Sequence, residues 1–102
     1  SRLSVHCYNE LLKSLCRVDQ VKEALIYFKQ MLSAKIAPNR ETFRIFMNFY
    51  AKKGDVENTL DWLNEHKRSF FTEDDQTREI VIQAFERSGN SQKMIEFFEK
   101  QD

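Results

Sequence analysis

The sequence repeats itself at an offset of 35 residues, and this internal repeat constrains the fold more than any other feature. At that offset, apolar residues align with apolar residues and turn residues with turn residues, without a gap. A single amphipathic bundle would show helical periodicity but no fixed offset, whereas solenoid arrays repeat one supersecondary unit at a constant period. The aligned columns include Leu11/Phe46/Val81, Leu12/Met47/Ile82, Leu15/Tyr50/Phe85, Arg17/Lys52/Arg87, Asp19/Gly54/Gly89, Leu25/Leu60/Ile95, Tyr27/Trp62/Phe97 and Phe28/Leu63/Phe98.

Each repeat contains two stretches whose apolar residues recur at helical spacing. Val5, Tyr8, Leu12 and Leu15 follow a three–four–three pattern, which marks one face of a helix. The sequence therefore predicts six helices in three antiparallel pairs, and the pairs must stack because one pair cannot bury its own apolar face. We expect a single array over 1–102, with repeats at 5–39 and 40–74 and an incomplete third repeat at 75–102.

The predicted turns carry residues that begin or end helices. We expect Asp19 to cap the second helix of its repeat. We expect Pro38 to end the helix before it, because the residue before a proline avoids helical backbone. The aromatic residues lie at helical spacing and are expected in the core rather than in a base-stacking stripe: Tyr8, Phe43, Tyr50, Trp62 and Phe85.

Charge composition alone does not indicate a nucleic-acid partner. The 16 basic and 16 acidic residues give a net charge of zero, whereas nucleic-acid-binding domains are often strongly basic. The charges are unevenly distributed, with six basic and three acidic residues in 1–39 and four against six in 75–102, so a polyanion would favour the N-terminal part. No apolar run approaches the roughly 20 residues that span a bilayer, and no membrane insertion is expected.

The residues that carry metal and redox chemistry are few and scattered. Cys7 and Cys16, if on one helix, are separated by about 13 Å at roughly 1.5 Å per residue, which is beyond disulfide reach. We expect both to be reduced and partly buried. His6 and His66 have no ligand cluster near them in sequence, and no catalytic triad or Gly-rich phosphate loop occurs. We therefore predict no metal, no cofactor and no enzymatic activity.

The first repeat contains a set of residues at characteristic places: the opening Tyr8–Leu12, the segment Leu15-Cys16-Arg17, Glu23-Ala24-Leu25, Phe28, Met31 and the closing Ile36-Ala37-Pro38-Asn39. On these residues it resembles a pentatricopeptide repeat. The second repeat matches partly, with Phe43 in place of the expected tyrosine, and the third departs further, with Arg78 where an aromatic residue is expected. The resemblance implies an all-α fold, a right-handed α-solenoid of antiparallel helix pairs.

The resemblance also implies binding of single-stranded RNA, with one base facing each repeat. In the family, one base-reading side chain follows the first-helix aromatic and the other follows the loop proline. In the family, the pair Asn9 and Asn39 favours pyrimidines. In the second repeat, the bulky Arg44 departs from the usual small polar residue. In the third, Glu79 would repel phosphate. These reading positions hold Asn9 and Asn39 in the first repeat, Arg44 and Asp74 in the second, and Glu79 in the third.

Two further sets of positions carry over from the family. The base stacks on the residue two before the aromatic, a place held here by His6, Glu41 and Gln76, of which His6 could stack. Positions that approach the phosphates correspond to Arg17, Lys52 and Arg87, which we call the basic column.

Each candidate also has a structural interpretation. Asn39 and Asp74 stand where the next helix begins, and an N-cap there contributes roughly 0.5–2 kcal/mol without any ligand. Capping and base reading are compatible. The basic column falls in the last turn of each first helix, where the helix dipole favours cations by about 0.3–1 kcal/mol. Asn9 has no obvious structural role on a helix, which favours recognition.

We therefore predict non-catalytic binding of organellar single-stranded RNA that supports RNA stability, processing or translation, in the mitochondrion or alternatively the chloroplast. No small-molecule substrate is expected. The alternative is a protein-binding scaffold within a mitochondrial ribosomal or respiratory assembly. The zero net charge favours the scaffold, and so do reading positions that change from Asn9 through Arg44 to Glu79.

Overall fold

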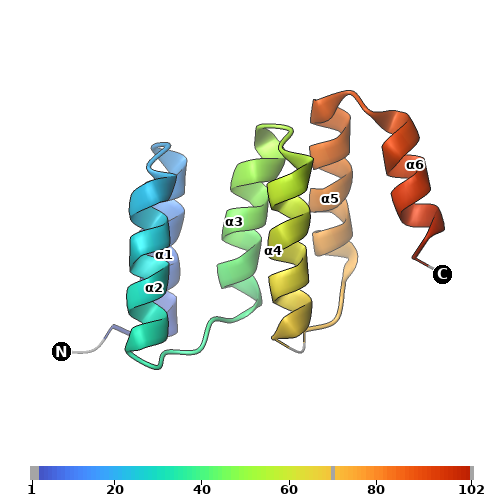
Figure 1. The fold of residues 1–102 in the computed structure, drawn as a ribbon. Helices are drawn as coiled ribbons and strands as arrows, with labels where there is room; N and C mark the ends of the chain where they lie inside the picture. Colours follow the sequence, from blue (N-terminus) through green and yellow to red (C-terminus); the bar gives the residue numbers. More distant parts are fainter. Residues whose placement is uncertain (1–2, 70, 102) are drawn as a thin grey trace. The chain divides into compact units, whose positions relative to one another are not determined.

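In the residues that the structure describes, 3–69 and 71–101, the chain forms six α-helices and no strand (Figure 1). This computed structural model confirms the six predicted helices. The first helices of the pairs begin at Val5, Arg40 and Asp75, so the 35-residue spacing is kept. Within the same residues no helix is long and apolar enough to cross a membrane. The helices are α1 (Val5–Arg17), α2 (Val21–Ser33), α3 (Arg40–Lys52), α4 (Val56–Arg68), α5 (Asp75–Ser88) and α6 (Ser91–Glu99).

The chain divides into two compact units, Ser1–Phe46 and Met47–Asp102, and the division falls inside α3. In the first unit α1 and α2 lie side by side and run antiparallel (Figure 1). Leu12, Met31 and Phe46 come from α1, α2 and α3 respectively, and all three are fully buried. The Phe28 ring meets the Phe46 ring edge-on, with centroids 5.6 Å apart. One helix pair and the start of the next first helix thus share a core.

The second unit has its own core, built from the second half of α3 with α4, α5 and α6. Phe85 of α5 and Phe97 of α6 contact each other with ring centroids 5.7 Å apart. Trp62, Met94 and Phe98 pack partly buried against this core. Its buried members are Met47, Ala51, Leu63, Ile80, Val81, Ala84 and Phe85.

The aromatic residues lie where helical spacing predicted them. Tyr8, Phe43 and Phe85 are buried, which confirms their place in the core. Trp62 packs partly buried against the core of the second unit, and Tyr50 is half-buried. Most of the aromatic surface is therefore occupied by packing and is not available to stack on bases.

The turn after each first helix contains a residue in the left-handed backbone region. Asp19 has φ 62°, Gly54 71° and Gly89 74°, so the aligned turn column is a column of left-handed residues. The prediction that Asp19 caps α2 is wrong, because Gln20 occupies the N-cap position and makes no side-chain cap. Instead Asp19 reverses the chain, and the Gln20 N–H bonds to the Leu15 carbonyl at 2.8 Å, as in a Schellman motif.

The same device ends α2, and it corrects the role expected for Pro38. Helix α2 ends at Ser33, five residues earlier than the proline. Lys35 has φ 62°, and the Ile36 N–H bonds to the Met31 carbonyl at 3.0 Å. A left-handed residue therefore ends this helix, and Pro38 belongs to the loop that leads to α3.

Gly54 and Gly89 share a left-handed conformation but differ in their surroundings. A Cβ at Gly54 would stand 3.0 Å from the backbone of Arg87 and Ser88 at the end of α5. A Cβ at Gly89 would meet nothing within 4 Å. Within the second unit, the turn after α3 and the end of α5 are thus in backbone contact that only glycine permits.

Candidate functional site

Asn9 lies on the buried face of α1, with only 2% of its surface exposed. Its Nδ2 donates to Oδ1 of Asn39 at 3.0 Å, and its Oδ1 accepts from the Thr42 hydroxyl at 2.7 Å. Asn39 directly precedes α3, and Thr42 lies in the first turn of that helix. These contacts tie α1 to the start of α3, and we call them the Asn9–Asn39–Thr42 network.

The network consumes the oxygen of the Asn39 side chain. Oδ1 of Asn39 accepts from Asn9 Nδ2 and also from the Thr42 backbone N–H at 3.2 Å, which occupies both of its lone pairs. The residue is nevertheless exposed, and among the hydrogen bonds of the described residues none engages its Nδ2. The group that Asn39 offers to a ligand is therefore a pair of N–H donors.

These contacts give Asn9 the structural role that the sequence did not suggest, since its buried carboxamide has both ends hydrogen-bonded. The capping role expected of Asn39 is confirmed by its bond from the Thr42 N–H. The Thr42 hydroxyl in turn accepts from the Asn39 N–H at 3.0 Å, which completes a capping box. Thr42 was not a candidate from the sequence, although its recurrence as Thr77, 35 residues on, could have signalled it.

The start of α5 repeats the capping geometry. Asp74 caps α5 as predicted: its carboxylate accepts from the Thr77 N–H at 2.8 Å, and the Thr77 hydroxyl accepts from the Asp74 N–H at 3.0 Å. Glu79 is exposed on α5, and Arg44 is half-buried on α3. Unlike the asparagine amide, the Asp74 carboxylate has no donor to offer a ligand.

The loop before α5 is held by ion pairs. Glu73, whose side chain is 16% exposed, lies 2.8 Å from Lys67 and 3.8 Å from Arg78. Arg78 is also 3.5 Å from Asp75. The arginine that replaces an expected aromatic residue therefore lies between two carboxylates.

The basic column lies where it was predicted. Arg17, Lys52 and Arg87 stand in the last turns of α1, α3 and α5, so each charge faces the negative end of a helix dipole. All three are exposed, and no ion pair in the described part of the chain engages them. They can serve both the helix ends and an external anion.

Of the three stacking positions, two are exposed and one is engaged. His6 and Gln76 are exposed in the first turns of α1 and α5. Glu41 lies 3.8 Å from Lys13 in an ion pair. The imidazole of His6 is thus the single aromatic ring among these positions, and its stacking role stays a prediction.

The two cysteines are free thiols. Cys16 is half-buried as expected, whereas Cys7 is exposed, so the expectation of partial burial was wrong for Cys7. Burial raises the pKa of the Cys16 thiol to about 11, which keeps it protonated at neutral pH. His66 is fully buried beside Phe71, and the described residues contain no group of three or more side chains that could hold a metal.

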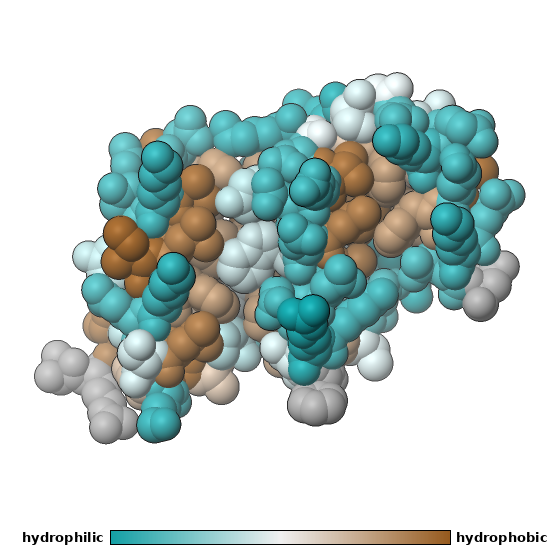
Figure 2. Space-filling view, viewed as in Figure 1, coloured by the Kyte–Doolittle hydropathy of each residue, from teal (hydrophilic) through white to brown (hydrophobic). Residues whose placement is uncertain are grey.

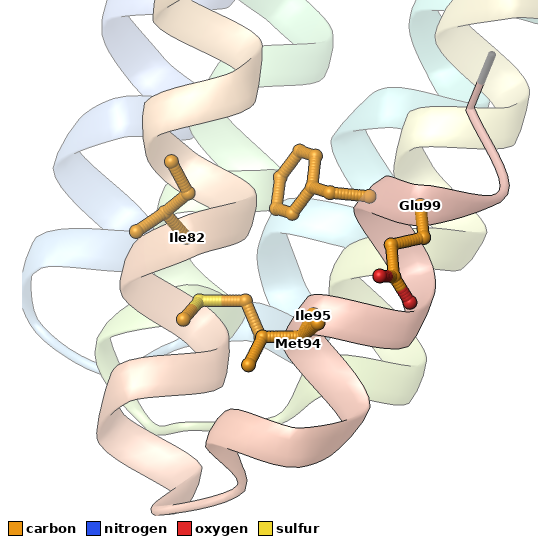
Figure 3. A pocket seen from close by; sticks show the side chains of 5 residues that line it. Ile82, Met94, Ile95 and Glu99 are labelled. Atoms are coloured by element: carbon orange, nitrogen blue, oxygen red, sulfur yellow. The ribbon is translucent and has the colours of Figure 1, made fainter.

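Apolar surface remains on each unit. Ile26 and Leu32 are exposed on α2, and Figure 2 shows hydrophobic side chains among hydrophilic ones over the α1–α2 pair. In the second unit, α5 and α6 line a shallow pocket of about 490 Å³ (Figure 3). It offers one carboxylate rather than several convergent polar groups, which is more typical of a packing surface than of a small-molecule site. The lining residues are Ile82, Met94, Ile95, Phe98 and Glu99.

Sequence comparisons agree with the repeat. Residues 3–50 match the model of the PPR repeat family. The pentatricopeptide repeat-containing protein At3g23020 of Arabidopsis thaliana is 28% identical over 96% of this chain, and At1g73710 of the same plant is 25% identical over 89%. The chain spans only 12% and 9% of the lengths of these relatives.

Solved structures show the same fold. Two crystal structures of the pentatricopeptide repeat protein PPR10 in complex with an 18-nt psaJ RNA element superpose with a TM-score of 0.83. Each is 21% identical to this chain, covering 95% of it and 14% of the PPR10 chain. This likeness confirms the predicted fold class, an all-α solenoid of helical repeats.

Proposed function

We propose that this chain is a member of the PPR repeat family, whose model matches residues 3–50, and that it binds single-stranded RNA without catalysing a reaction. The solved structures that it resembles are complexes of PPR10 with an RNA element. The division into repeats at 5–39, 40–74 and 75–102 is part of this proposal, with one base facing each complete repeat.

The observation that carries the proposal is the outward amide of Asn39. The Asn9–Asn39–Thr42 network fixes the position of this side chain and leaves its N–H donors at an exposed site. Bases in single strands present their edges to such groups, and pyrimidine edges carry carbonyl acceptors, to which cytosine adds a ring-nitrogen acceptor. In this interpretation Asn39 makes the direct contact, and Asn9 acts chiefly by holding it.

The basic column supplies the contacts to the RNA backbone in this proposal. Arg17, Lys52 and Arg87 are exposed and free of ion pairs in the described residues, so a phosphate would not have to displace a carboxylate. His6 is the candidate for stacking on the base. The pair at Arg44 and Asp74 would contribute little base selectivity, because the bulky Arg44 departs from the usual small polar residue. The lone Glu79 would contribute little because its carboxylate repels phosphate.

The biological outcome follows from tethering a transcript. We propose a role in RNA stability, processing or translation inside an organelle, the mitochondrion first and the chloroplast as the alternative. A protein-binding scaffold is the second candidate. The acidic surface at the start of α5 favours it, since the Asp75 side chain is 97% exposed and Glu79 is exposed.

The test measures fluorescence anisotropy of labelled single-stranded RNA against the chain at low and high salt. The discriminating variant is Asn39→Asp, which keeps an N-cap oxygen but removes the outward donors. The matched control is Asp74→Asn, the converse change at the equivalent cap. We expect Asn39→Asp to weaken binding about fivefold or more, as the loss of one hydrogen bond and a new repulsive charge require.

Two further results decide the proposal. Arg17→Gln should reduce the slope of log affinity against log salt by about 0.7, the value for one phosphate contact on a single strand. If the wild-type chain binds no RNA at either salt concentration, RNA binding is rejected and the scaffold becomes the leading function.

A further inference from the structure

We propose that Thr42 is a specificity-determining residue of the first repeat, because its hydroxyl sets the direction of the hydrogen bonds that make Asn39 a pure donor. The inference rests on the proposed RNA binding at Asn39. Thr42 is 0% exposed and touches no base itself, so it acts as a positioning residue.

The direction of the hydrogen bonds starts at the hydroxyl. Oγ1 of Thr42 accepts from the Asn39 backbone N–H at 3.0 Å, and its single proton is then free for one acceptor. Two oxygens are within reach: Oδ1 of Asn9 at 2.7 Å and Oδ1 of Asn39 at 3.1 Å. The shorter contact assigns the proton to Asn9.

That donation fixes the orientation of both carboxamides. With its oxygen held by Thr42, Asn9 must turn Nδ2 toward Asn39, where it donates at 3.0 Å. The Asn39 oxygen accepts this bond, and it also accepts from the Thr42 backbone N–H at 3.2 Å. The Nδ2 group of Asn39 is therefore directed away from the network.

Removal of the Thr42 hydroxyl would leave the orientation of the two carboxamides less strictly determined. In Thr42→Val the Asn9 oxygen loses its donor, and the carboxamide can rotate to present that oxygen to Asn39. The Asn9 oxygen would then attract the Asn39 amide inward, in competition with the capping bond from the backbone N–H of residue 42, which holds the Asn39 oxygen and is kept in this variant. The side chain would present a mixture of donor and acceptor, and it would distinguish bases poorly.

The donor-only state favours one pyrimidine. Cytosine has an unprotonated ring nitrogen beside its carbonyl oxygen, so the middle of its pairing edge accepts a hydrogen bond. Uracil has an N–H at that ring position, which opposes a donor. We expect the wild-type chain to bind oligocytidine about fivefold more tightly than oligouridine, the size of one net hydrogen bond.

Thr77 provides a matched control for the structural part of the role. It is also 0% exposed, completes the capping box of α5 and stands 35 residues after Thr42. Its hydroxyl donates to the Asp74 backbone carbonyl at 2.9 Å rather than to a reading side chain. Thr77→Val therefore removes a capping hydroxyl without changing the direction of any reading amide.

The experiment compares anisotropy titrations of labelled oligocytidine and oligouridine for the wild-type chain, Thr42→Val, Thr42→Ser and Thr77→Val. Circular dichroism melting confirms that each variant is folded at the assay temperature. We expect the preference for cytidine to fall to about one in Thr42→Val, with salt-dependent binding retained. Thr42→Ser should keep the preference because it keeps the hydroxyl, and Thr77→Val should keep it too.

The outcomes separate the two proposals. A preference that survives in Thr42→Val, or one that is lost equally in Thr77→Val, overturns the role of Thr42 and leaves RNA binding standing. Wild-type binding without a preference for cytidine also overturns it. Absence of RNA binding by the wild-type chain overturns the proposed function, and the role of Thr42 with it. Should Thr42→Val not fold, loss of the preference in Thr42→Cys, whose thiol is a weak donor, supports the role, and retention rejects it.

Discussion

The starts of α3 and α5 are built to the same plan and present opposite chemistry. At each, a short polar side chain caps the helix and a threonine three residues later completes a capping box. At the start of α3 the cap is Asn39, whose side-chain oxygen accepts a second hydrogen bond from Nδ2 of Asn9 in α1. At the start of α5 the cap is Asp74, and both side-chain oxygens are acceptors.

The difference shows that capping alone does not determine what a repeat can recognise. Capping requires one acceptor directed at the helix N-terminus, and asparagine and aspartate satisfy it about equally. The side-chain atoms that do not take part in capping determine what the residue can offer a ligand. At Asn39, the hydrogen bond from Asn9 of α1 leaves the Nδ2 group as the exposed donor. The array can therefore keep its fold constant while it changes the hydrogen-bonding character of its surface.

The largest expected effect on stability concerns Asn9, the buried partner of the Asn39 cap. Asn9→Ala should lower the free energy of unfolding by about 2–3 kcal/mol, because it removes the hydrogen bonds to Asn39 and from Thr42 and leaves empty space at a buried site. Glu79→Ala, at the aligned exposed position, should change it by no more than about 0.5 kcal/mol. Urea unfolding measures both, and equal losses would mean that the network contributes little to stability.

A smaller effect tests the cap of α5 alone. Asp74→Ala should cost about 1 kcal/mol of unfolding free energy, since the Thr77 N–H loses its acceptor. Asp75→Ala is the control, because its carboxylate is exposed and caps nothing. Thermal unfolding of the two variants in parallel checks the difference, and a larger loss for Asp75→Ala would refute the capping argument.

The ion pairs before α5 should contribute less still. Glu73→Gln should cost up to about 1 kcal/mol at low salt, and the cost should shrink as salt screens the pairs with Lys67 and Arg78. In the first unit, Glu10→Gln should have no measurable effect, because its pair with Lys13 is exposed, although the bond to Lys13 lowers the pKa of Glu10. A salt-independent cost at Glu73 would point to packing instead of charge.

The smallest effect on stability is expected from exchanging the two caps. Asn39→Asp and Asp74→Asn should each leave the free energy of unfolding within about 0.5 kcal/mol of wild type, since the cap oxygen is kept. Denaturant midpoints measured on both variants check this. A large loss in Asn39→Asp would show that its binding defect reports damage to the fold rather than the loss of a donor.

Much of the fold could be predicted from the sequence because the repeat leaves little freedom. The period placed the starts of the first helices, the last-turn position of the basic column and the caps at Asn39 and Asp74. The roles of Asp19 and Pro38 were predicted wrongly. In the aligned column Asp19 stands with Gly54 and Gly89, which is the pattern of a left-handed turn rather than of an N-cap.

The candidate site was less predictable, because it depends on contacts between helices. Asn9 and Thr42 are 33 residues apart, and nothing local in the sequence indicates that their side chains meet at 2.7 Å. The resemblance to the pentatricopeptide repeat implied that Asn9 and Asn39 form a pair, but it did not indicate which of them is buried. Likewise, the pairing of Glu73 with Lys67 and Arg78 depends on how the loop folds back toward α4 and α5.

The backbone contact at Gly54 bears on the engineering of longer arrays from these repeats. A designed array copied from the second repeat would carry glycine in every such turn, and neighbouring helix ends could approach as closely as Gly54 and Arg87 do. An array copied from the first repeat would carry Asp19 there, and its Cβ would need more room. The choice of template would therefore set the rise per repeat, and with it the spacing at which successive modules meet a polymer.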